Sequence, residues 1–400
     1  MIAVVGGGPA GAVTALRLAR LGHDVTLIER SAHSLARDGE SLHPGIWPLF
    51  DALGLRDDAG LRIHRSLIRW FSDEVVEKHH RIPQLAVMRP AFDAHLLDMA
   101  RAAGARIVRE ANIDDAQFVV DASGRASWSR GSRRRTSEPR IAMRGIWRGA
   151  GLPREARVEA LEEAWLWGSP MPDGSFAAIA CADAPADYHA LLSKSKLFRD
   201  LRGEATVHHC DATTYAADVV CDERLLRVGD ASHTLDPLSS SGVRSAMQSA
   251  LHASIVLNTM IRRPADTPIA LQFYRDAQHA AVTEHLAWTR SFYDRSTGAP
   301  AGMPAGASPP SVTLAPGIAI ADIPCIIGDF IEPRRGITGT ALPRPFVWIG
   351  GIEAAPLLDP LTHDALPRDT LLTRWSSLAP GRESALLDAL LRGGVLTLAG

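Results

Sequence analysis

The order of apolar and polar positions along the chain predicts a nucleotide-binding α/β core at its beginning. Residues 2–5 form a short apolar run, which is typical of a buried parallel strand. A glycine-rich turn, apolar positions at helical spacing over 12–21 and a second apolar run over 24–28 follow. Strand, turn, helix and strand within the first 30 residues make one unit of a Rossmann-like parallel sheet.

The remaining pattern extends this core and then changes. Helices are predicted over 43–55, 91–103, 242–261 and 268–293, and further strands over 67–71, 85–88, 106–108, 118–120 and 225–228. Between 140 and 220 the chain runs in short alternating segments, with strands predicted over 141–147, 165–167 and 176–180. These segments predict an antiparallel sheet beside the nucleotide fold.

The C-terminal part differs in composition. Residues 298–317 are rich in proline, glycine and alanine and are predicted to form a linker. The two helical patterns and the terminal strand that follow this linker resemble a small winged-helix module. Such a module either covers the fold or binds a partner protein, and the presence of the linker favours the second. The predicted divisions are a main region over 1–297 with a substrate sheet mainly over 60–90 and 140–220, the linker over 298–317, and a C-terminal module over 318–400.

Composition and charge exclude several classes of protein. With 46% hydrophobic and 22% charged residues, the chain of 400 residues is typical of a soluble globular protein, and no stretch is apolar for long enough to span a bilayer. A net charge of −2 gives no global field that favours nucleic acid or an anionic membrane. The start of the chain does not read as a signal peptide, and the scattered cysteines show no metal-ligand spacing: Cys181, Cys210, Cys221 and Cys325. We expect a cytoplasmic protein without a metal site.

Residues 6–11 satisfy the GxGxxG pattern of dinucleotide-binding proteins. Gly6 permits the tight turn, Gly8 lets a pyrophosphate approach the backbone, and Gly11 lets helix and strand pack closely. The helix that follows, with Pro9 and Ala10 in the motif, offers its N-terminal N–H groups to the phosphates. Glu29, the acid at the end of the next strand, is placed to bond a ribose diol. Arg30, which follows it, is another candidate for contact with the cofactor. A purely structural turn is the alternative, and the flanking strand, helix and acid disfavour it.

A second candidate segment follows the strand predicted over 225–228. Asp230 is placed to bond a hydroxyl of a ribityl chain, and a loop that begins at Pro237 leads through Ser241 into the long helix near Gly242. A helix N-terminus aimed at a flavin stabilises the negative charge of the reduced ring. Alone, these residues would be interpreted as a helix cap and a polar turn. Together with the first motif, they predict an FAD site.

Four segments carry a family resemblance: residues 6–11, Gly39-Glu40-Ser41-Leu42, Asp121-Ala-Ser-Gly124-Arg125, and the GDA…DP…SSGV pattern of residues 229–243. With them the chain resembles the glutathione-reductase-like flavoproteins of the p-hydroxybenzoate hydroxylase class, and within that class the flavin-dependent halogenases, over about residues 1–295. The resemblance implies an FAD-binding Rossmann domain with an interleaved antiparallel substrate sheet. It also implies FAD as cofactor, O2 as co-substrate, and NAD(P)H or a separate flavin reductase as the source of electrons.

The resemblance further implies that reduced flavin and O2 give a C4a-hydroperoxide, which delivers oxygen to an electron-rich aromatic ring. Halogenases carry in addition a lysine, early in the substrate domain, that turns hypohalous acid into a usable electrophile. The comparable stretch here, 61–70, contains arginines and no lysine, and Lys78 lies in the charged run 77–80, which is predicted to be a solvated turn. Because arginine stays protonated, oxygen insertion is favoured over halogenation.

The same resemblance implies further site residues. Trp165 and Trp167 match the halogenases' WxWxIP pattern, with Ser169 in place of isoleucine, and either line the active site or share one face of a half-buried strand. His43 is a candidate acid–base group, although a lone histidine in a loop is more often polar surface. No catalytic base is assigned. Three more residues are predicted to contact FAD: Ser41, Arg89 and Gly124.

Several functions remain open. Overall resemblance favours a monooxygenase that hydroxylates a tryptophan side chain of a precursor protein in tryptophylquinone cofactor biogenesis. A halogenase or small-molecule aromatic hydroxylase of natural-product biosynthesis is the alternative, and a flavin-bearing assembly protein without turnover is the third. The arginines at 125, 130 and 133–135 either dock a phosphate or an acidic partner, or form a solvated charge run.

Overall fold

The structure, a computed structural model, describes residues 1–30, 39–56, 60–184, 186–293, 311–362 and 365–399. Its residues group into two compact units, one of 1–254 with 281–295 and one of 255–280 with 296–400. The second unit therefore includes a stretch that the sequence analysis assigned to the main region. The reason lies in α5 (Gly242–Arg262), whose later residues bond within the second unit: the Asn258 amide donates to the Asp329 carbonyl at 2.8 Å, and the Ile331 N–H donates to the Thr259 hydroxyl at 2.9 Å.

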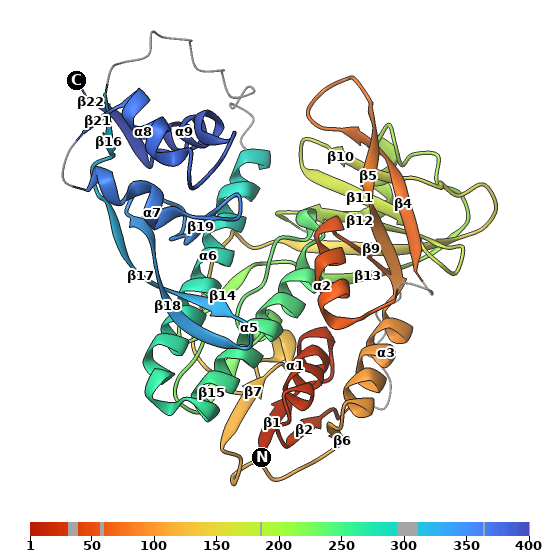
Figure 1. Ribbon diagram of the computed structural model, residues 1–400. Helices are drawn as coiled ribbons and strands as arrows, with labels where there is room; N and C mark the ends of the chain where they lie inside the picture. The colour runs from red at the N-terminus through yellow and green to blue at the C-terminus, as the bar shows by residue number, and fades with distance from the viewer. Residues whose placement is uncertain (31–38, 57–59, 185, 294–310, 363–364, 400) are drawn as a thin grey trace. The chain divides into compact units, whose positions relative to one another are not determined.

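A parallel sheet of five short strands lies in the first unit, next to the N-terminus of the chain (Figure 1). Its order is β15 (Leu225–Arg227), β7 (Phe118–Asp121), β1 (Ile2–Val5), β2 (Val25–Ile28) and β6 (Arg106–Val108). Every neighbouring pair is parallel, and α1 (Pro9–Arg20) connects β1 to β2. The predicted Rossmann-like sheet is therefore confirmed. It was predictable because its strands are apolar runs, which are typical of strands buried in a parallel sheet.

A second sheet of eight strands lies in the same unit. Its order is β13 (Glu204–Asp211), β9 (Ile141–Arg148), β12 (Phe176–Ala182), β11 (Ala164–Pro170), β10 (Ala156–Ala160), β4 (Leu61–Arg69), β5 (Val76–Met88) and β3 (Gly39–Leu42). The sheet is mixed rather than wholly antiparallel, because β4 and β10 run parallel. The charged run 77–80 belongs to β5, so its prediction as a solvated turn was wrong. Its side chains are largely exposed, and pairing with β4 makes it a strand.

The helices before the C-terminal module are also close to those predicted. α3 (Arg89–Ala102), α5 and α6 (Thr267–Tyr293) match their expected ranges within a few residues. The helix expected over 43–55 is shorter: a 3-10 turn at Pro44–Ile46 precedes α2 (Trp47–Leu53). Pro44 and Pro48 lack backbone N–H groups, and Gly54 ends the helix in the left-handed conformation with φ of 65°. Among the described residues, no helix combines the length and the hydropathy needed to cross a membrane.

The second unit contains the C-terminal elements. β16 (Ser311–Leu314) pairs with β21 (Leu366–Pro367) and β22 (Leu396–Ala399), next to the hairpin of β17 (Ile318–Ile327) and β18 (Phe330–Gly339). α8 (Arg368–Trp375) and α9 (Glu383–Arg392) occupy the two helical ranges that the sequence predicts. The strand β16 falls within the predicted linker, whose part over 298–310 lies outside the described residues. The module is therefore larger than helix, helix and terminal strand.

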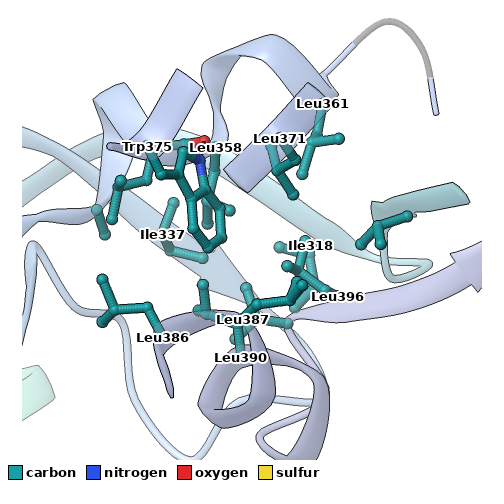
Figure 2. Close-up of a cluster of buried hydrophobic side chains, with 14 of the residues drawn as sticks. Ile318, Ile337, Leu358, Leu361, Leu371, Trp375, Leu386, Leu387, Leu390 and Leu396 are labelled. Atoms are coloured by element: carbon teal, nitrogen blue, oxygen red, sulfur yellow. Dashed lines mark hydrogen bonds between the residues drawn. The ribbon is translucent and has the colours of Figure 1, made fainter. Parts of the chain in front are cut away.

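This unit has a hydrophobic core of its own (Figure 2). Trp375 is fully buried at its centre and donates its indole N–H to the Leu357 carbonyl at 2.8 Å. Leucines of α8, α9 and the chain before them surround it: Leu358, Leu361, Leu371, Leu386, Leu387 and Leu390. We expect Trp375→Ala to lower the free energy of unfolding by about 3–5 kcal/mol, because it leaves a cavity and an unpaired carbonyl. Thermal unfolding tests this, with the exposed Trp348→Ala as control, and equal losses in both variants would contradict it.

Candidate functional site

The glycine-rich turn has the geometry that a dinucleotide requires. Gly6 has a φ of 110°, and a Cβ there would overlap the Ala122 carbonyl on the adjacent strand. A Cβ at Gly11 would overlap the carbonyl oxygen of Gly6, so this glycine allows the turn and α1 to touch. A Cβ at Gly8, in contrast, would meet no atom within 4 Å. The open side of the turn is therefore at Gly8, at the beginning of α1.

The N-terminus of α1 is suited to phosphate. Gly8 is the N-cap residue, no side chain caps the helix, and its first turn holds no acidic residue. The N–H groups of this turn, which include that of Ala10 after Pro9, belong to an end that carries a positive partial charge. Glu29 follows β2, accepts the Gly7 N–H at 2.6 Å and so lies at the turn, whereas Arg30 is exposed. These features fit the diphosphate and ribose of FAD.

The other cofactor motifs meet this turn at the same edge of the sheet. Because β15, β7, β1 and β2 are parallel neighbours, the residues that follow them lie side by side. Gly229, after β15, has a φ of 57°, and a Cβ there would lie 3.0 Å from the Ala10 side chain. Gly124, after β7, has a φ of 67°. Between these two, the Arg125 guanidinium is paired with the Asp230 carboxylate at 4.0 Å.

The loop before α5 packs against the second sheet through Leu238. It forms a 3-10 turn at Pro237–Ser239, and Ser240 then adopts a left-handed conformation with φ of 48° before α5 begins at Gly242. Ser241 is buried, and its hydroxyl donates to the Ser239 carbonyl at 3.1 Å. The His43 N–H donates to the Ser240 carbonyl at 3.2 Å. The imidazole of His43 itself accepts the Gly45 N–H, while partial burial and then Arg244 lower its pKa. His43 thus lies next to the loop as a neutral group at neutral pH.

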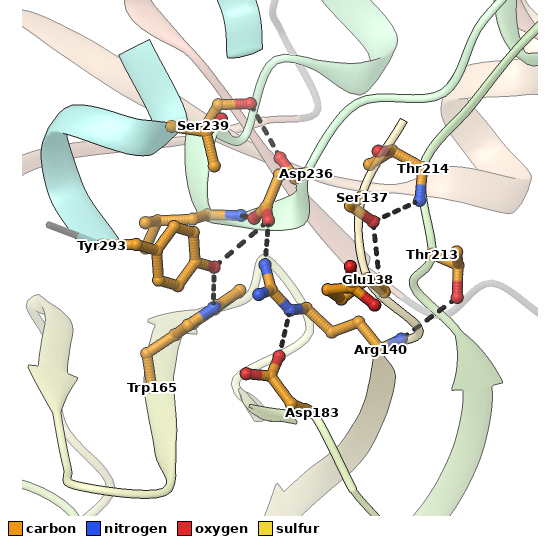
Figure 3. A network of polar contacts seen from close by, with 12 residues as sticks. Ser137, Glu138, Arg140, Trp165, Asp183, Thr213, Thr214, Asp236, Ser239 and Tyr293 are labelled. Carbon is orange, nitrogen blue, oxygen red and sulfur yellow. Dashed lines mark hydrogen bonds and ion pairs between the residues drawn. The ribbon is translucent and has the colours of Figure 1, made fainter. Parts of the chain in front are cut away.

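Asp236 holds this loop in place (Figure 3). Its buried carboxylate accepts hydrogen bonds from Arg140 at 2.6 Å, from the Tyr293 hydroxyl at 3.1 Å and from the Leu238 N–H at 2.9 Å. Its own N–H donates to Nε2 of His285 at 2.8 Å. Burial, and next the Asp236 carboxylate, raises the pKa of Tyr293, which therefore stays a neutral donor. The loop is thus bonded to the residue before β9, to α6 and, through His43, to the segment after β3.

Trp165 and Trp167 lie on the face of the second sheet against which Leu238 and Tyr293 pack. The Trp165 indole N–H donates to the Tyr293 hydroxyl at 2.5 Å, which joins this tryptophan to the Asp236 network (Figure 3). Leu166, between them, faces the opposite side and packs with Tyr188 and Phe198. Both tryptophans are nearly fully buried. The two interpretations of this pair are thus compatible, since one strand face carries both rings toward the loop.

Two predicted contacts with FAD have other partners in the structure. Arg89 is buried and paired with Asp93, at 2.9 and 3.0 Å, and with Glu40 at 2.7 Å. The Ser41 hydroxyl is also buried and donates to the Gln84 amide oxygen at 3.2 Å. These bonds join β3, β5 and α3 to one another. Contacts of Arg89 and Ser41 with the cofactor stay predictions.

Sequence analysis missed Arg140, Tyr293 and His285. Arg140 directly precedes β9 and the other two belong to α6, and nothing in their local pattern indicates that they converge on Asp236. Asp236-Pro237 was recognised as part of a motif, but not as the anchor of the loop. No cluster of histidine, cysteine and acidic side chains suited to a metal ion occurs in the part of the chain that the structure describes.

His233, within the second motif, is expected to make the stability of the protein depend on pH. It is buried between the hydroxyls of Ser232 and Ser245, and burial, followed by the nearby His285, lowers its pKa to about 4. Between pH 6.5 and pH 4 this histidine binds more protons in the unfolded chain, so its contribution to the free energy of unfolding is fully present above this window and is lost as the pH falls through it. We expect this histidine to contribute a loss of about 3 kcal/mol, measured by denaturant unfolding.

The matched variants are His233→Gln and, as control, the exposed His79→Gln. The first should be less sensitive to pH than the wild type, and the second should follow the wild type. Identical pH dependence in all three proteins would contradict the assignment.

Comparisons with known proteins agree with this geometry. The family described as "FAD dependent oxidoreductase" matches residues 1–130. The tryptophan 2-halogenase of Chondromyces crocatus is 28% identical over 355 residues, which cover 73% of this chain and 67% of the relative.

Two solved structures share the fold over nearly the whole chain. The flavin-dependent halogenase CmlS superposes with a TM-score of 0.82 at 20% identity, covering 99% of this chain and 95% of the other. The peptidyl tryptophan dihydroxylase QhpG, which is essential for tryptophylquinone cofactor biogenesis, superposes with a TM-score of 0.72 at 23% identity, covering 98% of each chain. These likenesses include the second unit, which the expected limit of about residue 295 left out.

Proposed function

Because this chain is an FAD-dependent oxidoreductase of the flavin-dependent halogenase-like class, we propose that it inserts oxygen, rather than a halogen, into an electron-rich aromatic ring. The observation that carries this proposal is the placement of the lysines. The chain has three of them, Lys78, Lys194 and Lys196, and all are exposed. Lys194 is also paired with Glu163. Lys78 lies on the same face of the second sheet as the two tryptophans, because it pairs with Ser66 and Ser66 pairs with Ala156 of their cluster. Its side chain is exposed, however, and none of the three lysines is buried with the tryptophans.

The arginines of the stretch where halogenases carry their lysine are engaged elsewhere. On β4, Arg65 pairs with Glu155 at 2.7 Å, and Arg69 pairs with the buried Glu159 at 3.0 Å. Arg62 lies over the Trp47 ring, 5.0 Å from its centre. These contacts hold the strands and α2 together and leave the guanidinium groups as structural elements. They support the view that no side chain of this stretch carries a halogen.

We assign an indole as the ring attacked, and a tryptophan side chain of a precursor protein in tryptophylquinone biogenesis as its source. The sequence relative described above and one of the two solved structures both act on tryptophan, according to their names. Trp165 and Trp167, although nearly fully buried, give this face of the second sheet the aromatic, apolar character that suits an indole. The tryptophan 2-halogenase favours the alternative, a halogenase or hydroxylase of a small aromatic molecule.

In this proposal bound FAD, once reduced by a partner flavin reductase or NAD(P)H, supplies the activation of O2. The residues of the chain position the reactants. The turn at 6–11 and the N-terminus of α1 hold the diphosphate, and the loop 236–241 presents the beginning of α5. The apolar face with Trp165 and Trp167 excludes water from the ring, which the reaction requires.

A mass spectrum tests the proposal directly. The FAD-loaded protein is supplied with a flavin-reducing system, O2, bromide, free indoles, phenols and tryptophan-bearing precursor proteins. We expect added oxygen on a protein tryptophan and no brominated product. Bromine on any ring would establish the halogenase alternative, and oxygen on free indole alone would establish the small-molecule hydroxylase.

A further inference from the structure

Residues 128–135 form a positively charged surface in the first unit, which we call the arginine patch: Trp128, Arg130, Arg133, Arg134 and Arg135. All five side chains are exposed. No acidic residue occurs between Asp121 and Glu138, so the sequence supplies no local counter-ion. Within the described part of the chain, the four arginines form no ion pair, and the exposed Asp218 on the neighbouring segment forms none with them. The patch thus presents four uncompensated charges on a chain whose net charge is −2.

The patch is built on a rigid turn. The fully buried Asp121 carboxylate accepts the N–H and the hydroxyl of Ser123, at 3.0 and 2.5 Å, and those of Ser129, at 2.9 and 2.5 Å. The Trp128 N–H donates to the Ser123 hydroxyl at 2.7 Å. Ser127 and Arg130, on either side of Trp128, have φ of 45° and 46°, a backbone conformation that residues other than glycine rarely adopt. A solvated charge run does not require such a support.

Strand β8 (Arg133–Arg135) continues the patch. It pairs with β14 (Tyr215–Ala217), and Arg133 lies over the Tyr215 ring, 4.9 Å from its centre. Tryptophan, arginine and tyrosine are the residues that most often carry the binding energy of protein–protein interfaces. A pre-organised turn lowers the entropy cost of association. The composition and the support therefore match a docking surface.

The arginine patch is connected to the residues that are predicted to hold the cofactor. The Arg133 guanidinium donates to the Arg125 carbonyl at 3.0 Å, and Arg125 is paired with Asp230 of the second cofactor motif. The arginine patch thus continues from the residues that follow β7 and β15. Trp165 and Tyr293 belong to a different group of residues, on the face of the second sheet. A protein bound to the patch would approach the side of the cofactor.

From these observations we propose that the arginine patch docks an acidic flavin reductase, the protein that passes electrons from NADH to FAD. The inference rests on the proposed function, in which a partner supplies the electrons. Charge complementarity selects the partner and speeds the encounter. In the reaction NADH gives up a hydride to the reductase and becomes NAD⁺, the reductase passes on the two electrons and the proton of that hydride, and FAD takes them up with one further proton from solvent.

The test compares two double variants of the FAD-loaded protein. Arg134→Gln/Arg135→Gln removes two charges of the patch, and Arg199→Gln/Arg202→Gln removes two exposed arginines elsewhere in the same unit. The probe is an acidic NADH-dependent flavin reductase, and the readouts are its binding to the immobilised protein and the anaerobic loss of flavin absorbance. We expect the patch variant to show about tenfold weaker binding, slower reduction and a flatter salt dependence, while the control matches the wild type. Trp128→Ala should weaken binding at any salt concentration.

Photoreduction of FAD without a reductase separates this inference from the proposed function. Photoreduced patch variant and wild type should give equal yields of oxygenated product. Absence of oxygenated product from both proteins would contradict the proposed function, whereas the comparison of reductase binding would still be valid. Equal reductase binding by the two double variants would overturn the docking surface. Displacement of the reductase by nucleic acid, or a change of oligomeric state in the patch variant, would overturn it in favour of a different partner.

Discussion

The Gly8→Ala variant is expected to fold like the wild type and to lose FAD. A Cβ at Gly8 meets no protein atom within 4 Å, so the folded chain accepts the added methyl group. The same open side is where a diphosphate would approach the N-terminus of α1. We expect a loss of affinity of about a hundredfold, which corresponds to about 3 kcal/mol. Flavin absorbance relative to protein absorbance, and calorimetric titration with FAD, measure it.

Two comparisons make this prediction specific. Gly11→Ala should lose FAD together with stability, because its Cβ would overlap the Gly6 carbonyl oxygen. Ala19→Ser, at the far end of α1, should keep both. A Gly8→Ala protein that binds FAD with wild-type affinity would show that the diphosphate does not lie against this turn.

The cofactor edge was predictable from the sequence because its signals are local. Gly6 to Gly11 and Glu29 fall within a single βαβ unit, and a run of apolar residues precedes each motif. Once the strands are known to be parallel, the residues that follow them must lie at one edge of the sheet. The structure brings Gly229 to Ala10 and Arg125 to Asp230 accordingly.

The support of the loop before α5 was not predictable in this way. Arg140, Asp236 and Tyr293 are separated by 96 and 57 residues, and their convergence depends on how the second sheet and α6 pack. A motif reports which residues recur at a position, and it does not report their partners. Arg89 illustrates this, since its position at the start of a helix is equally suited to a cofactor contact and to the ion pairs that the structure contains.

Two errors in the secondary structure have physical causes. The run 77–80 is polar and charged, which favours a turn in isolation, yet hydrogen bonding to β4 makes it a strand. Apolar spacing over 43–55 favoured one helix, but Pro44 and Pro48 remove N–H groups within it. In the first case tertiary pairing outweighs local propensity, and in the second a local restriction outweighs the apolar pattern.

Asp236→Asn is expected to have the largest effect on the loop that precedes α5. The substitution keeps the size of the side chain but removes the charge that pairs with Arg140 and that orients the Tyr293 hydroxyl. Because the carboxylate is buried, its loss leaves Arg140 partly uncompensated, and we expect a decrease of about 3–5 kcal/mol in the free energy of unfolding. Denaturant unfolding of the FAD-free protein measures this decrease.

The matched control is Asp183→Asn, because Asp183 pairs with the same guanidinium, at 2.8 Å, but is exposed. Exposed pairs contribute about 0–1 kcal/mol, so the two variants should differ by several-fold in their effect on stability. Weakened FAD binding in Asp236→Asn alone would show that the loop contributes to the cofactor site through its anchor. Equal, small effects in both variants would mean that β9 and α6 hold the loop without this carboxylate, and the Asp236 network would then be an incidental contact of the fold.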